Sequence, residues 1–314
     1  MSQPRILVTC PPMLGLFDEF ADDFSASGLV GVAAETTQIL SEDELIAKLP
    51  DFEGWIIGDD PASYRVIEAA RAGKLRAAVK WGVGIDNVDF PAFESLGVPV
   101  ENTPGVFGNE VADVALTYIL GLARETYWID RQVRSKHTWP KPSGISMGGR
   151  TVALVGFGDI GQQIAKRVIA CGSRVVVYDP FFENPHNLGV EQAVWPENLG
   201  DADFLIFACP LTDQTTGMFD FNILQHLKSG VRVVNVARGP VIVEDALVEA
   251  LGSGLVHSAA LDVFEVEPLP KDSALRGFDK CIFGTHNSSN SKDAVRRVSR
   301  LAIEKMARLL AAVS

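Results

Sequence analysis

Short apolar runs alternate with amphipathic segments along the first hundred residues of the chain. This alternation predicts strands and helices in turn, because apolar runs of four to six residues are typical of buried strands and the segments between them repeat at helical spacing. The predicted strands are residues 5–10, 55–58, 77–81 and 98–101, and the predicted helices are residues 14–26, 41–49, 63–72 and 91–96. The second helix begins with a capping box at residues 41–44, Ser-Glu-Asp-Glu. We therefore expect an α/β lobe with a parallel sheet to be complete before residue 104.

A long helical segment at residues 109–134 connects this lobe to a second series of apolar runs. The second series predicts strands at residues 151–155, 175–178, 204–209, 231–236, 258–261 and 281–284. A last helix is expected at residues 293–312, and we expect it to return to the first lobe, whose own helices are few. The predicted fold class is α/β, with two lobes that each contain a parallel sheet. Residues 104–286 would form one domain, and residues 1–103 with 287–314 would form the other, discontinuous domain.

Three glycines follow the strand predicted at residues 151–155, in the pattern Gly-x-Gly-x-x-Gly. Gly156 permits a tight turn, Gly158 lets the backbone approach a pyrophosphate, and Gly161 lets the next helix pack closely on the strand. The N-terminus of that helix offers unpaired N–H groups and a partial positive charge to the phosphates. Asp179 ends the following strand, eighteen residues after Gly161, where its carboxylate suits the adenosine ribose hydroxyls and repels a 2′-phosphate. The pattern predicts NAD rather than NADP; the alternative is a glycine-rich turn that binds no ligand.

Length, charge and cysteine content narrow the classes of function. The chain has 314 residues, enough for two domains with cores of their own. Its net charge of −12 argues against a general nucleic-acid-binding or anionic-membrane-binding protein. The four cysteines form no Cys-x-x-Cys pair, which favours free thiols in a reducing compartment, so we expect a cytoplasmic protein. No apolar run approaches the roughly 18 residues needed to span a bilayer, and no set of metal ligands is predicted.

Three successive predicted strands end in charged or titratable residues. His286 follows the last apolar run, acids at residues 262–267 follow the run before it, and Arg238 follows the run that ends at residue 236. Ligands of open parallel sheets bind at the carboxyl ends of strands, so we expect these side chains to face one crevice. Arginine suits bidentate binding of a carboxylate, and an acid beside His286 would fix its tautomer and stabilise the imidazolium. With a nicotinamide cofactor this set suits hydride transfer at a 2-hydroxy acid. Taken singly, each residue could instead be a structural histidine, a surface ion pair or a solvated acid.

With these motifs in this order, the chain resembles the D-isomer-specific 2-hydroxyacid dehydrogenase family, which includes phosphoglycerate, glycerate and D-lactate dehydrogenases. The resemblance covers essentially the whole chain. The motifs that carry it are residues 82–89 (Gly-Val-Gly-Ile-Asp-Asn-Val-Asp), residues 110–113 (Glu-Val-Ala-Asp), the glycine pattern with Asp179, residues 210–215, residues 235–239, residues 262–268 and His286. The resemblance implies an α/β fold of two Rossmann-like lobes with parallel sheets, in which an NAD-binding lobe is inserted into a flavodoxin-like substrate lobe. It also implies a homodimer joined through the NAD-binding lobe.

The resemblance also implies roles for individual residues. Arg238 would bind the substrate carboxylate and oxo group, His286 would be the acid–base, and Glu267, which directly precedes a proline, would be its partner. The backbone of Val83 and Gly84 would hold the substrate carboxylate. The residues implied for the cofactor are Gly156, Gly158, Asp159, Ile160, Gly161, Asp179, Pro210, Thr215, Ala237 and, against the nicotinamide carboxamide, Asp262. The implied reaction interconverts a D-2-hydroxy acid and its 2-oxo acid with NAD. The alternative is an NAD(H)-sensing, corepressor-like binding protein of the same fold.

Two segments depart from the family pattern. Residues 287–290, Asn-Ser-Ser-Asn, stand where many members have a glycine pair, which would alter the substrate wall. Asp59 and Asp60 stand where phosphoglycerate-using members carry an arginine, and two acids are poor hosts for a phosphate. We therefore expect a non-phosphorylated 2-hydroxy acid as substrate. Trp81 and Trp139 could add apolar surface to the pocket, although core packing is the alternative for both.

Overall fold

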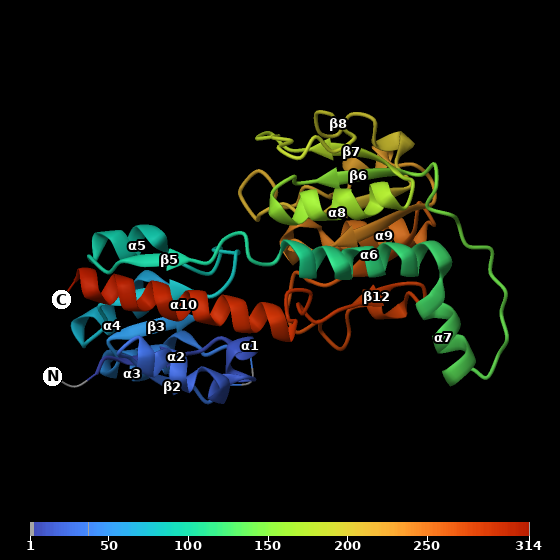
Figure 1. The fold of residues 1–314 in the computed structure, drawn as a ribbon. Helices are drawn as coiled ribbons and strands as arrows, with labels where there is room; N and C mark the ends of the chain where they lie inside the picture. Colours follow the sequence, from blue (N-terminus) through green and yellow to red (C-terminus); the bar gives the residue numbers. More distant parts are fainter. Residues whose placement is uncertain (1–2, 37, 314) are drawn as a thin grey trace. The chain divides into compact units, whose positions relative to one another are not determined.

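The chain divides into two compact units in the computed structural model, which describes residues 3–36 and 38–313. Unit 1 consists of residues 1–107 with 290–314, and unit 2 of residues 108–289. Each unit has a hydrophobic core of its own, one within residues 7–98 and the other within residues 153–281. Both units contain a parallel sheet with helices, so the predicted fold class is confirmed (Figure 1). Residues 1–2, 37 and 314, which belong to the predicted discontinuous domain, lie outside the described residues.

Unit 1 has five parallel strands in the order β2-β1-β3-β4-β5, which is the order of flavodoxin-like sheets. The strands are β1 Arg5–Val8, β2 Val30–Ala33, β3 Gly54–Ile57, β4 Ala77–Lys80 and β5 Val100–Asn102. The helices are α1 Pro11–Leu14, α2 Ala21–Ala26, α3 Glu42–Lys48, α4 Tyr64–Ala72, α5 Phe90–Ser95 and α10 Lys292–Ala312. One face of the sheet packs against α3, α4 and α5. The other face packs against α10. The apolar positions of α10 that recur at helical spacing are all buried: Val295, Val298, Ala302, Met306 and Leu309.

The start of α3 shows how a local sequence signal fixes a helix end. Ser41 is the N-cap residue, and its Oγ accepts a hydrogen bond of 3.4 Å from the backbone N–H of Glu44. The Glu44 carboxylate accepts one of 2.8 Å from the backbone N–H of Ser41. Two N–H groups that have no partner within the helix are thereby satisfied. The predicted capping box is confirmed.

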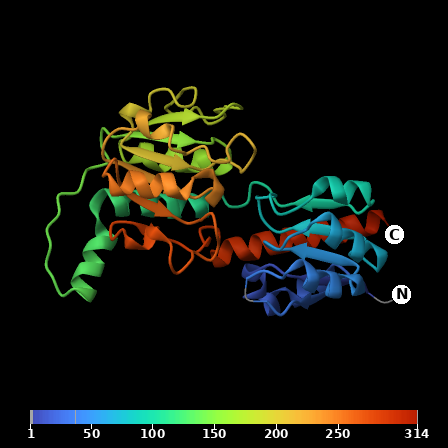
Figure 2. The ribbon, with the colours of Figure 1, turned by 180° about the vertical axis from the view of Figure 1, so that it is seen from behind.

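Unit 2 has seven parallel strands in the order β12-β11-β10-β9-β6-β7-β8. The strands are β6 Thr151–Val155, β7 Arg174–Tyr178, β8 Val190–Gln192, β9 Phe204–Phe207, β10 Val231–Asn235, β11 Val256–Leu261 and β12 Ile282–Phe283. The α-helices are α6 Gly108–Arg124, α7 Thr126–Ser135, α8 Asp159–Ala170 and α9 Glu244–Gly252. Helices α6 and α8 cover one face of the sheet in Figure 1, and α9 covers the other face, seen from behind in Figure 2. The strand order reverses on either side of β6, as in a Rossmann sheet, which places the glycine pattern at the topological switch point.

The structure differs from the predicted elements at a few places. The single helix expected at residues 109–134 is broken at Glu125, whose backbone has a left-handed φ of 54°, so that α6 and α7 are separate helices. The edge strands β2 and β8 were not predicted. The short strand β2, Val-Gly-Val-Ala, contains a glycine, β8, Val-Glu-Gln, is mainly polar, and both are partly exposed. The helix expected at residues 14–26 is divided into α1, a 3₁₀ turn at Phe17–Phe20, and α2. Within the described part of the chain, no helix is long and apolar enough to span a membrane.

Candidate active site

His286 and Glu267 form a direct pair at the end of β12. The Nδ1 atom of His286 lies 2.9 Å from Oε2 of Glu267, and each side chain is 28% exposed. The other oxygen of Glu267 accepts a hydrogen bond of 3.0 Å from the backbone N–H of Phe264. Because Nδ1 faces a carboxylate in either protonation state of the ring, it carries a proton, and Nε2 is the atom that can exchange one. The pair therefore has the geometry of an oriented acid–base.

Arg238 follows β10, two strands away from β12 in the sheet. The buried side chain of Asn235 holds this loop on both sides, accepting from the Ala237 backbone N–H at 3.0 Å and donating to the Arg238 carbonyl at 2.9 Å. The next residue, Gly239, leaves no room for a side chain, because a Cβ there would collide with the backbone carbonyl of Phe264. Asn235 was not among the residues predicted for the site. Its position at the C-terminal end of a strand, directly before the loop of Arg238, was the feature of the sequence that could have identified it. Three neighbouring strand ends thus carry the arginine, the acids and the histidine to one edge of the sheet.

Asp262, which follows β11 directly, is almost completely buried, with 2% of its surface exposed. Its carboxylate accepts hydrogen bonds from the backbone N–H groups of Asn287 and Ser288 and from the hydroxyl of Tyr118 on α6. Its backbone carbonyl accepts from the His286 N–H at 2.7 Å. The predicted contact of Asp262 with a nicotinamide carboxamide stays a prediction. Tyr118 could not be identified from the sequence, because nothing near it marks it as part of this site.

The glycine pattern leaves open space where a pyrophosphate is expected. Gly156 has a φ of 93°, which side chains rarely adopt, and a Cβ there would meet the carbonyl of Ala208 at 2.7 Å. A Cβ on Gly161 would collide with the carbonyl of Gly156, so helix and strand pack in close contact. No atom lies within 4 Å of the place of a Cβ on Gly158, the N-cap residue of α8. An open backbone next to a helix N-terminus fits a dinucleotide phosphate.

Asp159, Ile160 and Asp179 adjoin this glycine loop, and Thr215 lies in the loop that follows the neighbouring strand β9. Asp179 follows β7, and its carboxylate accepts from the backbone N–H groups of Phe157 at 2.6 Å and Phe181 at 2.8 Å. Asp159 and Ile160 open α8, and the Asp159 carboxylate lies against Gly108. Thr215 orders the loop that follows β9, because its hydroxyl donates to the carbonyl of Pro210 at 2.7 Å and accepts from the N–H of Thr212 at 2.8 Å. These residues fit a dinucleotide with a free ribose 2′-hydroxyl.

Val83 and Gly84, predicted to hold the substrate carboxylate, belong to unit 1, in the loop that follows β4. Gly82 before them has a φ of 121°, and its N–H donates to the Thr103 hydroxyl at 2.8 Å. The carbonyl of Val83 accepts from the Asn102 side chain at 3.3 Å. The turn is therefore fixed by side chains at the end of β5.

The two acids at residues 59 and 60 differ in their surroundings. Asp60 is completely buried, accepts from the N–H groups of Leu40 and Gly58 and from the Thr9 hydroxyl, and burial raises the pKa of its carboxyl. It is therefore a structural acid. Asp59 is exposed and forms an ion pair of 3.0 Å with Lys80, which is itself buried. The buried lysine beside this loop was not predicted from the sequence.

The two tryptophans considered for the pocket have opposite environments. Trp81 is 6% exposed, donates to Ser299 at 3.1 Å and contacts the ring of Phe107, so core packing is the correct interpretation there. Trp139 is 79% exposed, so core packing is wrong for it.

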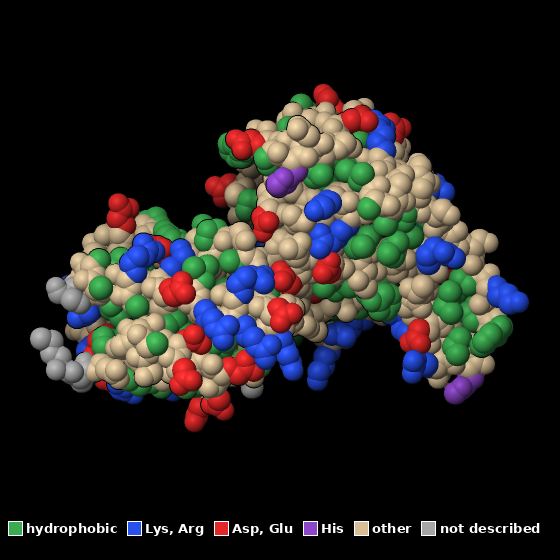
Figure 3. Space-filling view, in the orientation of Figure 1, with side chains coloured by type: hydrophobic (Ala, Val, Ile, Leu, Met, Phe, Trp, Pro, Cys, Tyr) green, Lys and Arg blue, Asp and Glu red, His purple; other side chains and the backbone are tan. Residues whose placement is uncertain are grey.

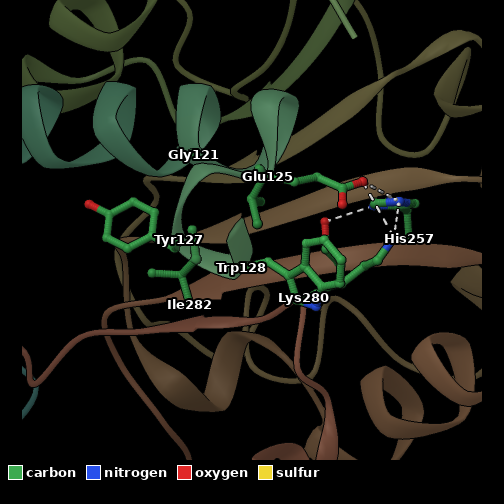
Figure 4. Close-up of a pocket in the computed structure, with 9 residues that line it drawn as sticks. Gly121, Glu125, Tyr127, Trp128, His257, Lys280 and Ile282 are labelled. Carbon is green, nitrogen blue, oxygen red and sulfur yellow. Dashed lines mark hydrogen bonds and ion pairs between the residues drawn. The ribbon is translucent and has the colours of Figure 1, made fainter. Parts of the chain in front are cut away.

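A second cluster of titratable groups lies at the N-terminal ends of β11 and β12 in unit 2, opposite the C-terminal strand ends described above (Figure 4). The buried Glu125 carboxylate lies 3.3 Å from Nζ of Lys280 and 3.4 Å from Nε2 of His257, and these two atoms are 3.2 Å apart. Glu125, His257 and Lys280 line a pocket of about 200 Å³ together with Trp128, and the ammonium of Lys280 lies over the ring of Trp128. Since an ammonium only donates, Nε2 of His257 accepts from it and Nδ1 carries the proton toward Ser258. This cluster lies at the N-terminal ends of β11 and β12, whereas His286 follows the C-terminal end of β12. Among the described residues, no group of three or more His, Cys, Asp or Glu side chains could hold a metal ion.

Comparison with known proteins identifies the family. The sequence model described as D-isomer specific 2-hydroxyacid dehydrogenase, NAD binding domain, matches residues 116–288. The chain belongs to the D-isomer-specific 2-hydroxyacid dehydrogenase family. Residues 116–288 are thus an NAD-binding domain, and the predictions of the family and of NAD as its cofactor are confirmed.

Relatives and solved structures agree with this assignment. Hydroxypyruvate reductase of Thermotoga maritima is 34% identical over 277 residues, which are 86% of this chain and 89% of that protein. D-3-phosphoglycerate dehydrogenase of Archaeoglobus fulgidus is 33% identical over 278 residues, but the match covers 87% of this chain and only 52% of that protein. The chain spans about half the length of the curated phosphoglycerate dehydrogenases that it matches.

Among solved structures, the TT0316 protein of Thermus thermophilus superposes with a TM-score of 0.87 at 30% identity, covering 98% of this chain and 97% of that one. The D-mandelate dehydrogenase of Rhodotorula graminis, in its holo form, gives a TM-score of 0.83 at 27% identity, covering 98% of this chain and 94% of that one.

Proposed function

We propose that this protein is an NAD-dependent oxidoreductase that interconverts a D-2-hydroxy acid and its 2-oxo acid. The observation that carries the proposal is the contact of 2.9 Å between His286 Nδ1 and Glu267 Oε2, at the edge of an NAD-binding domain that also presents Arg238. An oriented imidazole next to a carboxylate is suited to proton transfer. A guanidinium is suited to holding a carboxylate. The alternative of an NAD(H)-sensing corepressor has no support from the relatives described above, which are named for reductase or dehydrogenase activity.

Each residue has a part in this proposal. When bound, NADH would supply the hydride to the carbonyl carbon of the 2-oxo acid. His286, as imidazolium, donates a proton from Nε2 to the oxo oxygen, while Glu267 holds Nδ1 and stabilises the charged ring. Arg238 binds the carboxylate and oxo group, and the backbone of Val83 and Gly84 binds the same carboxylate. In the reverse reaction neutral His286 accepts the hydroxyl proton.

The contacts that we propose between this chain and NAD are those implied by its resemblance to the family. Gly156, Gly158, Asp159, Ile160 and Gly161 would hold the pyrophosphate at the N-terminus of α8. Asp179 would accept hydrogen bonds from the adenosine ribose. The remaining contacts are assigned to Pro210, Thr215, Ala237 and Asp262. Supporting this are the open space at Gly158 and the position of Asp179 beside the glycine loop.

The substrate is proposed to be a non-phosphorylated 2-hydroxy acid. Asp59 is exposed in the loop where a phosphate-binding arginine was expected, and its carboxylate would repel a phosphate. The pairing with Lys80 leaves the loop without a net positive charge to attract one.

A homodimer joined through unit 2 is proposed as the working form. None of the ten residues of α7 is buried, and Tyr127, Val133 and Trp139 are exposed by 39%, 37% and 79%. Figure 3 shows hydrophobic side chains at the surface over α6 and α7. Exposed apolar patches of this kind mark interaction sites. Sedimentation velocity tests the proposal: a Trp139→Asp, Val133→Asp variant should sediment as a monomer, and an unmodified protein that is monomeric at micromolar concentration would contradict it.

We also propose that the protein works in the cytoplasm. All four cysteines are free, and burial raises the pKa of the Cys209 and Cys281 thiols to about 11. Buried protonated thiols suit a reducing compartment.

The decisive experiment measures NADH oxidation with a panel of 2-oxo acids. Glyoxylate, hydroxypyruvate, pyruvate and phenylglyoxylate probe different side chains, and phosphohydroxypyruvate probes the phosphate. We expect turnover with at least one non-phosphorylated acid and a lower kcat/KM with phosphohydroxypyruvate. A protein that binds NADH but oxidises it with none of these acids would contradict the dehydrogenase assignment and favour the sensing alternative.

A further inference from the structure

The carboxylate of Asp262 is a hub for the turn that carries His286. Its Oδ1 accepts from the backbone N–H of Asn287 at 3.3 Å, and its Oδ2 accepts from that of Ser288 at 3.0 Å. The backbone carbonyl of the same residue accepts from the His286 N–H at 2.7 Å. Three consecutive N–H groups of the turn therefore bond to residue 262, so the position of that residue sets the position of the turn.

The remaining partner of this carboxylate comes from a different element. The hydroxyl of Tyr118, on the buried face of α6, donates to Oδ1 of Asp262 over 3.3 Å. Burial, with the nearby Asp262 charge as a second cause, raises the pKa of the Tyr118 phenol. The phenol thus remains protonated, and so remains a donor, throughout the working range of a dehydrogenase.

Two backbone features indicate that the arrangement is held under constraint. A Cβ on Gly284 would collide with the Asp262 carboxylate and would lie 2.5 Å from the Tyr118 oxygen, so the pair closes directly over the end of β12. His286 itself has a φ of 53°, a conformation that costs energy for a residue with a side chain and persists only where neighbours impose it. The N–H contacts to Asp262 are among the interactions that hold it in this conformation.

We propose that Tyr118 and Asp262 form a positioning pair that holds the His286 turn, and through it the imidazole, in the orientation needed for proton transfer. The proposal rests on the proposed dehydrogenase function and adds a role to it. The predicted contact of Asp262 with the nicotinamide carboxamide is compatible, because a carboxylate has about four acceptor positions and three are used by these donors. Tyr118 contacts neither substrate nor cofactor in this scheme and acts through Asp262.

Tyr118→Phe isolates this role, since it removes one hydroxyl and keeps the ring that fills the core. The matched control is Tyr178→Phe, which removes a buried phenol hydroxyl bonded to the Glu197 carbonyl at 2.6 Å in the same unit. We expect kcat for the 2-oxo acid to fall on the order of tenfold in Tyr118→Phe, the equivalent of one buried hydrogen bond to a charged group. The KM for the 2-oxo acid and the Kd for NADH should change less than twofold. Amide hydrogen exchange at Asn287 and Ser288 should accelerate in Tyr118→Phe and stay unchanged in Tyr178→Phe.

A double-variant cycle with Gly284→Ala gives an independent check. The added methyl displaces the Asp262 carboxylate, so Tyr118→Phe should cost little further kcat in that background. Additive losses in the cycle, or normal exchange at residues 287–288 together with normal kcat in Tyr118→Phe, would overturn the pair. If the unmodified protein turns over no 2-oxo acid, the proposed dehydrogenase function is wrong, and so is the proposed effect of Tyr118 on kcat. The exchange rates at residues 287–288 would still show whether Tyr118 holds the turn.

Discussion

The two oxygens of the Glu267 carboxylate have separate partners. One acid can therefore both orient the imidazole of His286 and stabilise its charged form. One oxygen is fixed by the Phe264 N–H, and the other faces His286 Nδ1. The first contact holds the carboxylate in place when the imidazole loses its proton. The second favours the imidazolium, which is the form needed for reduction.

Glu267→Gln removes this charge while keeping the shape of the side chain. The imidazolium loses its anionic partner, so the upper pH limit of kcat/KM for the 2-oxo acid should move to lower pH, and reduction near pH 7.5 should slow. The measurement is a pH–rate profile of the variant beside Glu265→Gln, whose carboxylate accepts from the Glu244 N–H and does not contact the histidine. An identical profile for Glu267→Gln and the unmodified protein would exclude the pair.

His286→Ala removes the acid–base itself. We expect kcat to fall by roughly 10²–10⁴-fold, the usual contribution of a positioned acid or base. NADH should still bind, because the glycine loop and Asp179 are unchanged, and fluorescence titration checks this. Near-normal turnover in His286→Ala would remove the acid–base assignment.

Arg238→Ala should raise the KM for the 2-oxo acid as well as lower kcat, because the guanidinium is proposed to bind the substrate carboxylate.

The choice of cofactor depends on the charge of Asp179. Asp179→Asn keeps an acceptor for the Phe157 N–H and removes the negative charge that repels a 2′-phosphate. The ratio of the Kd for NADPH to the Kd for NADH should fall on the order of tenfold, since one ion–ion repulsion near the surface is worth about 1–4 kcal/mol. Isothermal titration with both dinucleotides measures the ratio. Equal affinity of the unmodified protein for NADH and NADPH would show that this acid does not select the cofactor.

The sequence marked some of these residues as candidates and did not mark others, for a physical reason. His286, Glu267 and Arg238 each stand at the end of an apolar run or in a dense local motif. Tyr118 is 144 residues from its partner and resembles any other core residue of an amphipathic helix. Asp60 shows a different limit of the sequence, which grouped it with Asp59 as an acid that disfavours a phosphate. The structure buries it completely, and its carboxylate accepts from backbone N–H groups.

At the scale of elements, the break between α6 and α7 depends on contacts that the local sequence does not contain. Glu125 adopts a left-handed backbone although no glycine, proline or asparagine stands there. Its side chain is 6% exposed, and its carboxylate forms an ion pair of 3.3 Å with Lys280, which lies 155 residues further along the chain. The corner is therefore fixed by tertiary ion pairing, and residues 109–134 could only be predicted as one helix.

The same cluster predicts how stability depends on pH. Burial lowers the pKa of His257, and the nearby Arg232 and Lys280 charges lower it further, against the opposing charge of Glu125. The unfolded chain then takes up a proton near pH 6.5 while the folded chain does not. Stability is fully present above pH 6.5 and falls as pH drops from there toward the lower folded pKa. In His257→Gln, the free energy of unfolding should decline less between pH 7 and pH 5.

Urea unfolding at several pH values, followed by tryptophan fluorescence, measures this difference. The control is His186→Gln, which changes an exposed histidine outside the cluster. Parallel pH curves for His257→Gln and the unmodified protein would show that the buried imidazole does not titrate differently in the folded and unfolded chains.

At the scale of the whole molecule, local patterns predicted the elements but not all of their partners. The spacing of apolar residues in α10 predicted its buried face, and that face packs on β3 and β4 in the first third of the chain. Its polar side adds ion pairs such as Lys305 with Glu101, 204 residues apart. Strand order in either sheet follows from such long-range packing and could be expected only through the resemblance to a known family.

The two hydrophobic cores predict separate responses to the cofactor. All residues proposed to contact the dinucleotide lie in unit 2. Among the described residues, its core cluster within residues 153–281 is separate from the cluster of unit 1 within residues 7–98. A ligand stabilises only the folded state that binds it, so NADH at 100 times its Kd should stabilise unit 2 by about 2.7 kcal/mol. The slowest amides of unit 2 should then exchange roughly 100-fold more slowly. Amides of residues 3–36, 38–107 and 290–313 should change little. Hydrogen exchange resolved by peptide, with NADPH at the same concentration as the weaker-binding control, measures both units together. Equal protection of both units would mean that they unfold as one cooperative body, in which case the cofactor stabilises the whole chain rather than the NAD-binding domain alone.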